Sequence, residues 1–85
     1  MLQTFVKTIN SHQIEFSRLH YPLRYQVFIR IENENPLMVV IQKDENSHEW
    51  NIKSEEHLEA WVQDMGPKLI DLIEKNELNT TLAAV

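Results

Sequence analysis

The sequence of 85 residues predicts a single α+β domain, in which an antiparallel β-meander of about five strands packs against one C-terminal amphipathic helix. Two spacings of apolar side chains support this fold. Up to Ile52 the apolar residues recur at every second position, the period of a strand, whereas after Ser54 they recur every three or four positions, the period of a helix. Length supports it as well, because a chain this short has room for only one hydrophobic core.

The segment 25–31 is the clearest strand, since apolar side chains at its odd positions alternate with other residues at its even positions. The polar residues and proline of 32–36 indicate a turn, after which the alternation resumes over 37–43. These two strands therefore form a hairpin, and Ile31 is expected opposite Leu37.

A second turn at 44–47 leads into a short strand in which Trp50 and Ile52 point to the same face. With Lys43 opposite His48, the apolar positions of all three central strands fall on one side of the sheet. Both turns thus predict the same core face.

The C-terminal helix is expected to begin near Ser54, an N-cap residue followed by acidic side chains that complement the positive end of the helix dipole. Gly66-Pro67 interrupts its apolar stripe without changing the phase, so one helix kinked near this pair, or two helices nearly in line, is favoured over a chain reversal. The stripe consists of Leu58, Trp61, Val62, Met65, Leu69, Leu72 and Ile73.

Residues 2–10 fit two interpretations. Apolar residues on both sides of Asn10-Ser11 suggest a β-hairpin, but the spacing from Leu2 to Ile9 also fits a helix. The hairpin is preferred, because β-branched residues are frequent here. The domain is expected to span 1–78, with 79–85 as a flexible C-terminal tail.

Composition limits the partners and the compartment. The net charge of −5 and the scattered basic residues argue against nucleic-acid binding. The longest apolar run, 37–41, is too short to span a membrane, and no signal peptide is recognised. The absence of cysteine is typical of a reducing compartment, so a soluble cytoplasmic protein is expected.

No enzyme or cofactor signature is found in the chain. The single glycine, Gly66, excludes the glycine-rich phosphate loops and the nucleophile elbow. The histidines lack metal-ligand spacing, and His48 with His57 would be the first pair to test. The calcium-loop pattern from Asp44 to Glu55 lacks its turn glycine. We therefore expect a non-enzymatic protein with neither metal nor cofactor.

The candidate interaction surface lies on the sheet face opposite the helix. In the expected register Phe28 faces Val40 and Arg30 faces Met38, which places an apolar cluster inside a polar rim. Such a cluster often marks an interface, although an ordinary strand surface, or an N-terminal helix covering this face, would also account for it.

The leading hypothesis is a protein-interaction module that binds a protein partner or itself, as a homodimer, through Phe28, Arg30, Met38 and Val40. The rival hypothesis is a small-ligand-binding domain with a cleft between sheet and helix near Tyr25, Trp50 and Trp61.

Overall fold

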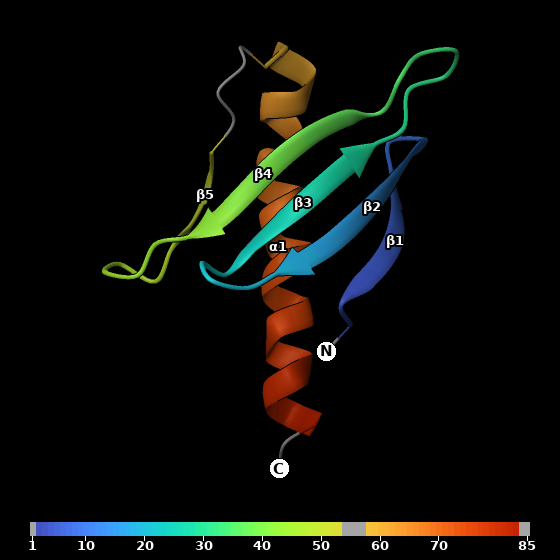
Figure 1. Cartoon of the computed structure of the whole chain (residues 1–85). Coiled ribbons are helices and arrows are strands. Elements are labelled where there is room, and N and C mark those ends of the chain that lie inside the picture. Colours follow the sequence, from blue (N-terminus) through green and yellow to red (C-terminus); the bar gives the residue numbers. More distant parts are fainter. Residues whose placement is uncertain (1, 54–57, 84–85) are drawn as a thin grey trace.

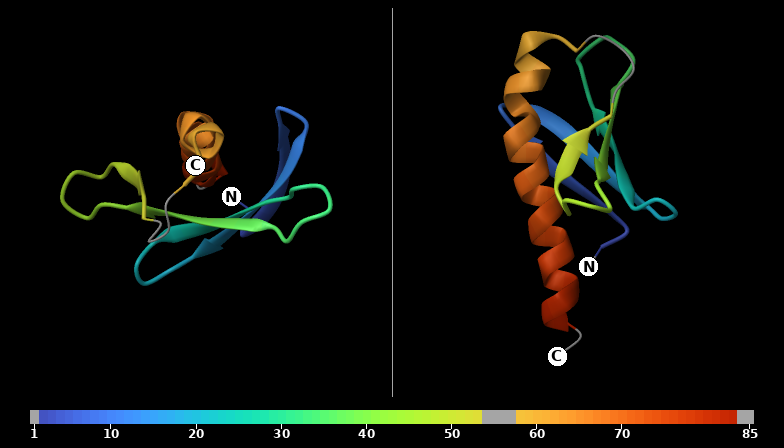
Figure 2. Two further views of the ribbon diagram at one scale, coloured as in Figure 1. Left: turned by 90° about the horizontal axis from the view of Figure 1, so that it is seen from above. Right: turned by 90° about the vertical axis from the view of Figure 1, so that its left-hand side faces the viewer.

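The computed structural model describes residues 2–53 and 58–83 and confirms the α+β fold: a five-stranded antiparallel sheet with one C-terminal helix. The strands follow one another in the sheet in chain order, and the helix crosses one face of it while the other face is left bare (Figures 1 and 2). Across the described ranges, no helix combines the length and the apolar character needed to cross a bilayer. The elements are β1 (Thr4–Ile9), β2 (His12–Leu19), β3 (Arg24–Ile29), β4 (Leu37–Lys43), β5 (Trp50–Ile52) and α1 (Ala60–Ala83).

The N-terminal segment is a hairpin, as preferred, and not a helix. Ile9 pairs with His12, so the loop has two residues, and both Asn10 (φ 50°) and Ser11 (φ 69°) adopt the left-handed conformation. Two successive residues of this kind match the right-handed twist of the flanking strands. Further along β1, the Phe5 ring stacks on Phe16 with centroids 4.6 Å apart.

The expected pairing of β3 with β4 is wrong by two residues. Ile29, not Ile31, lies opposite Leu37, and the connection 30–36 is longer than predicted. The cause is a turn in which the Ile31 carbonyl accepts the Glu34 N–H and Asn33 adopts a φ of 63°. Because the shift is even, every side chain keeps the face that was predicted for it.

The same shift occurs between β4 and β5, where Lys43 pairs with Trp50 and not with His48. Here the Asp44 carboxylate accepts the N–H groups of Asn46 and Ser47, which stabilises a six-residue loop. Hydrogen bonds from these two backbone groups hold the pKa of Asp44 below its usual value. The loop is therefore wider than the turn that the sequence indicated.

The helix begins at Ala60, later than expected, and the predicted N-cap region 54–57 lies outside the described residues. It runs continuously through Gly66 and Pro67, so the two-helix alternative is wrong, and it continues to Ala83, past the expected domain end at 78. Gly66 is buried where the helix approaches β5, and a Cβ there would lie 3.0 Å from Ile52 Cδ1.

The core lies between α1 and the covered sheet face, as the two spacings predicted. From the predicted helical stripe, Leu58, Trp61 and Leu72 are only partly buried. The fully formed core comprises Ile14, Phe16, Tyr25, Val27, Ile29, Val39, Ile41, Trp50, Val62, Met65, Leu69 and Ile73.

Candidate functional site

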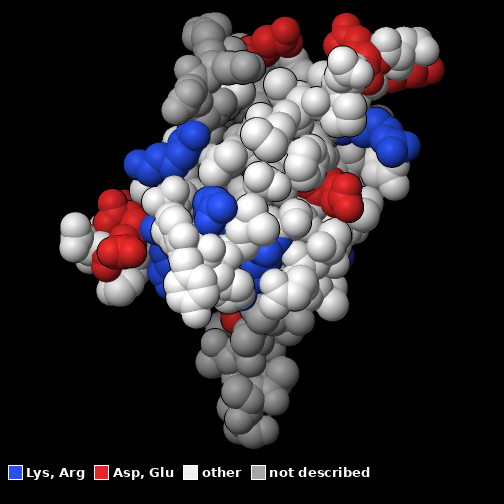
Figure 3. Space-filling view, in the orientation of Figure 1, with Lys and Arg blue, Asp and Glu red and all other residues white. Residues whose placement is uncertain are grey.

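No element among residues 2–53 and 58–83 covers the sheet face opposite α1, and three of the four residues in its central row are apolar. Register places Val6, Glu15, Phe28 and Met38 side by side across four strands. Val6 is 49% exposed and Met38 46% exposed, whereas Phe28 is half-buried by its neighbours. Figure 3 views this face and shows an uncharged area with single blue and red groups around it. We call these four residues, together with Val40 and Arg30, the outer face.

The predicted surface residues all lie on the outer face, but with different neighbours. Phe28 is opposite Met38 and Val40 is opposite Gln26, so the expected pairs Phe28–Val40 and Arg30–Met38 are wrong. The two-residue shift of β4 is the cause. Arg30 lies just beyond β3 and is exposed, and its backbone N–H is bonded to the Gln13 carbonyl. The N-terminal segment does not cover this face but widens it with β1.

A shallow hollow of about 190 Å³ marks one side of the outer face. Carboxylate and guanidinium side chains of opposite charge lie on its wall, next to the Phe28 ring. Its lining consists of Val6, Gln13, Glu15, Phe28, Arg30 and Pro36. The outer face therefore offers an apolar depression flanked by both signs of charge.

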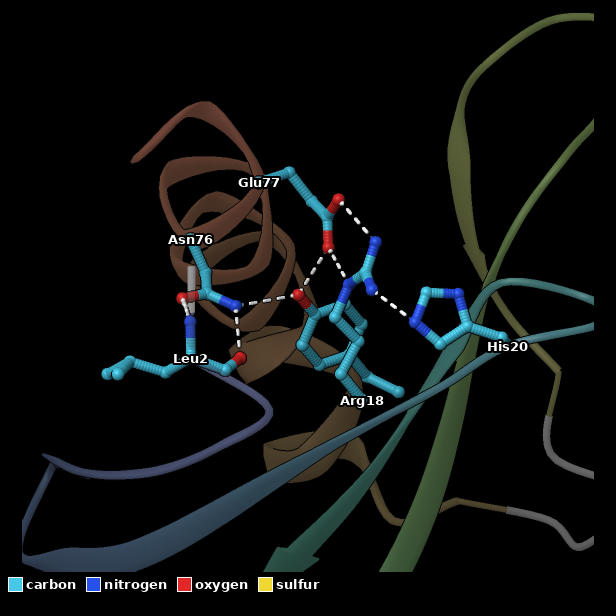
Figure 4. A network of polar contacts seen from close by, with 6 residues as sticks. Leu2, Arg18, His20, Asn76 and Glu77 are labelled. Atoms are coloured by element: carbon cyan, nitrogen blue, oxygen red, sulfur yellow. Dashed lines mark hydrogen bonds and ion pairs between the residues drawn. The ribbon is translucent and has the colours of Figure 1, made fainter. Parts of the chain in front are cut away.

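On the covered side, a polar network that the sequence analysis missed fastens α1 to the sheet (Figure 4). Arg18 binds the Glu77 carboxylate through two hydrogen bonds, Nε to Oε1 at 2.6 Å and Nη2 to Oε2 at 3.1 Å. The Tyr25 hydroxyl donates to the same Oε1 at 2.5 Å and accepts a hydrogen bond from Asn76 Nδ2 at 2.8 Å. Arg18 also reaches His20 Nε2 at 2.5 Å.

The network includes the chain before β1. Asn76 accepts the Leu2 N–H through Oδ1 at 3.0 Å and donates to the Leu2 carbonyl through Nδ2 at 2.9 Å. The Asn76 side chain thus makes the two hydrogen bonds with the Leu2 backbone that a neighbouring strand would otherwise make. Every buried side-chain nitrogen and oxygen among the described residues has a hydrogen-bond partner.

The network shifts the pKa of three of its members, Arg18, Tyr25 and Glu77; that of Arg18 is raised, chiefly by its hydrogen bond to Glu77. Burial alone would raise the pKa of Glu77, but hydrogen bonds from Arg18 and Tyr25 and the Arg18 charge outweigh it, so this pKa lies below its usual value. Burial, followed by the hydrogen bond to Glu77, raises the pKa of Tyr25 far above its usual value. Glu77 is therefore held as a carboxylate and Tyr25 as a phenol, which is the arrangement of a structural clamp.

The sequence did contain a signal for this network. Arg18 continues the inward positions of Ile14 and Phe16 on β2, and Asn76 and Glu77 follow Ile73 at helical spacing. A polar residue at a position that periodicity predicts to be buried needs a partner, and here the two polar ends of the apolar stripes meet.

The predicted cleft near Tyr25, Trp50 and Trp61 does not bring these three side chains together. Tyr25 is fully buried and Trp50 packs edge to face against it at 5.6 Å, so both belong to the core. Trp61 lies at the other end of the sheet, stacked on His12 with centroids 4.9 Å apart.

Among the residues that the structure describes, no group of three or more histidine, aspartate or glutamate side chains is placed to hold a metal ion. His48 lies in the β4–β5 loop, and His57, its proposed partner, is outside the described residues. Comparisons with protein-family models, with curated proteins and with solved structures gave no match, so the function of this α+β chain has to be inferred from its own residues.

Proposed function

We propose that this protein is an interaction module that associates with a second copy of itself through the outer face. The observation that carries the proposal is the row of Val6, Phe28 and Met38 on a sheet face that α1 leaves bare. An antiparallel sheet can leave a polar face in water, whereas apolar side chains on such a face are removed from water only by packing against another layer.

The local charges of the outer face, unlike the net charge of the chain, suit a second copy as the occupant. A chain with a net charge of −5 repels its own copy unless the contact region is locally balanced. Glu15 and Arg30 supply that balance, since both line the hollow beside Phe28. In a two-fold contact the same patch meets itself, so a face that carries both signs can oppose unlike charges.

The size of the face sets the strength of the contact. The whole sheet face that carries these residues has five strands about 4.8 Å apart, which are three to eight residues long and average six. At ~3.3 Å per residue it measures roughly 24 by 20 Å, so two such faces bury at most about 1,000 Å² in total. This area is at the lower bound for a specific interface. We therefore expect a dissociation constant of about 10–100 μM and a dimer that dissociates on dilution.

Sedimentation equilibrium between about 5 and 500 μM protein tests this proposal over the range that the area predicts. The wild type should shift from the mass of one chain towards two, and Met38→Lys and Phe28→Gln should remain monomeric with urea midpoints close to that of the wild type. Leu78→Lys is the matched control, because Leu78 is also an exposed apolar residue (58%) but lies on α1. A wild type that stays monomeric at the highest concentration, or a Leu78 variant that dissociates equally, would refute the proposal.

A further inference from the structure

A second hollow, of about 450 Å³, lies on the helix side of the sheet, between the β3–β4 loop and the start of α1. This volume is within the range of about 300–1,000 Å³ that small-molecule sites occupy. It opens on the opposite side of the sheet from the outer face, because Ile31 and Leu37, which line it, continue the inward positions of β3 and β4. Pro36, at the edge between the two sides, lines both hollows.

The lining of this hollow is about half apolar and half polar. Ile31, Leu37 and Leu58 contribute aliphatic surface, and Trp61 contributes an aromatic ring. The charged side chains among its described lining residues are Glu34 and Glu59, both of them acidic and exposed. A ligand that matches these walls has an apolar body and a positive charge.

Trp61 is held in position before any ligand arrives. His12 stacks on the indole with an interplanar angle of 20°, and a His12 ring nitrogen lies 3.3 Å from the Arg30 carbonyl oxygen. The indole N–H donates to the Glu59 carboxylate, which places that carboxylate beside the ring. A cation beside the Trp61 ring and the Glu59 carboxylate is attracted both by the quadrupole of the ring and by the negative charge of the carboxylate.

We propose that this hollow binds a small organic cation, a primary or quaternary ammonium group attached to an apolar body. The ammonium group lies between Glu34, Glu59 and the Trp61 ring, and the apolar body contacts Leu37 and Leu58. An anion would meet two carboxylates, and a bare metal ion would find only two charged ligands, Glu34 and Glu59, among the described lining residues.

Titration with 2-phenylethylammonium chloride, followed by 1H–15N NMR of the Trp61 indole N–H, tests the proposal against the neutral isostere 2-phenylethanol. We expect a dissociation constant of about 0.1–1 mM for the amine, the range for a ligand of this size, and at least about tenfold weaker binding of the alcohol. Equal affinity for both compounds, or no shift of the Trp61 indole signal by the amine, would overturn the proposal.

Variants identify the groups responsible. Glu34→Gln combined with Glu59→Gln should weaken the amine about tenfold, which corresponds to about 1.4 kcal/mol, and leave the alcohol unchanged. Glu32→Gln is the matched control, because Glu32 is an exposed acidic residue of the same loop that does not line the hollow. Trp61→Phe should bind the amine a few times more weakly. Amine binding that is unaffected by the double substitution would refute the assigned roles, and none of these outcomes depends on the outer face.

Discussion

Replacing Glu77 by glutamine should destabilise the protein strongly, because this one carboxylate accepts hydrogen bonds from Arg18 and Tyr25. A hydrogen bond to a charged group contributes about 1.5–3 kcal/mol, and three such bonds end on Glu77. Glutamine keeps one oxygen for Tyr25 but presents its amide NH2 group, a donor, to the donor groups of Arg18. Arg18 then lacks an acceptor, and its side chain is only 9% exposed. Glu77 itself is 24% exposed, so water replaces part of the loss, and we expect about 2–3 kcal/mol.

Urea unfolding at pH 7, monitored by tryptophan fluorescence, measures this change in the free energy of unfolding. For a domain of this size, the same change lowers the melting temperature by about 10–20 °C. Glu74→Gln is the matched control, because it removes the same charge from an exposed position of α1 and should change the stability by less than about 0.5 kcal/mol.

The pH dependence of this difference provides a second test. The pKa of Glu77 is lower in the folded protein than in the unfolded chain, so its contribution to stability is fully present above the ordinary glutamate pKa. It should be lost as the pH falls through the lower, folded-state pKa. The wild type should therefore approach the Glu77→Gln variant in stability as the pH falls below 4.5, the ordinary glutamate pKa. A Glu77 variant as stable as the Glu74 variant, or a difference that does not change with pH, would refute the clamp.

Three further substitutions test neighbouring features of the fold. Tyr25→Phe should lower the free energy of unfolding by about 1–2 kcal/mol at pH 7. Above pH ~10 this difference from the wild type should shrink, because the Tyr25 pKa is higher in the folded protein than in the unfolded chain and the wild type therefore loses stability as the pH rises; urea titrations at pH 7 and pH 11 measure both effects. Asn76→Ala should lower the free energy of unfolding by about 1–2 kcal/mol and abolish the protection of the Leu2 amide in hydrogen exchange. Unchanged protection would mean that the Asn76 side chain does not hold the backbone of Leu2. Gly66→Ala should unfold with a free energy within about 0.5 kcal/mol of the wild type, since the gain in helix propensity offsets a contact of 3.0 Å with the flexible end of Ile52. Gly66→Leu should lower the free energy of unfolding by about 1–3 kcal/mol, because the larger side chain separates α1 from β5. Equal stability of the two variants would contradict this close approach.

The sequence predicted the layers of the fold because alternation and helical spacing determine which face each residue occupies. Val27, Ile41 and Leu69 were assigned to the core by period alone, and all three are fully buried. Pairing was harder to predict, since a shift by two residues preserves the faces and leaves the hydrophobic pattern unchanged. What decided the register was local turn chemistry, such as the hydrogen bonds that the Asp44 carboxylate accepts.

The sites were predicted less completely than the fold. The outer-face residues Phe28 and Met38 could be placed by parity, but whether the outer face binds a second copy stays a prediction. The clamp of Arg18 and Glu77 was missed because its partners lie 59 positions apart in the chain. Only a model of how α1 crosses the sheet brings such distant polar residues together.

The position of the clamp partners in the chain has a consequence for biosynthesis. Arg18 and Tyr25 leave the ribosome 59 and 52 residues before Glu77, the acceptor of their hydrogen bonds. Until that part of α1 emerges, the apolar face of the nascent sheet stays exposed and the Arg18 guanidinium group lacks the Glu77 carboxylate. We therefore expect the nascent polypeptide to become resistant to proteases only once the part of α1 that carries Asn76 and Glu77 has emerged.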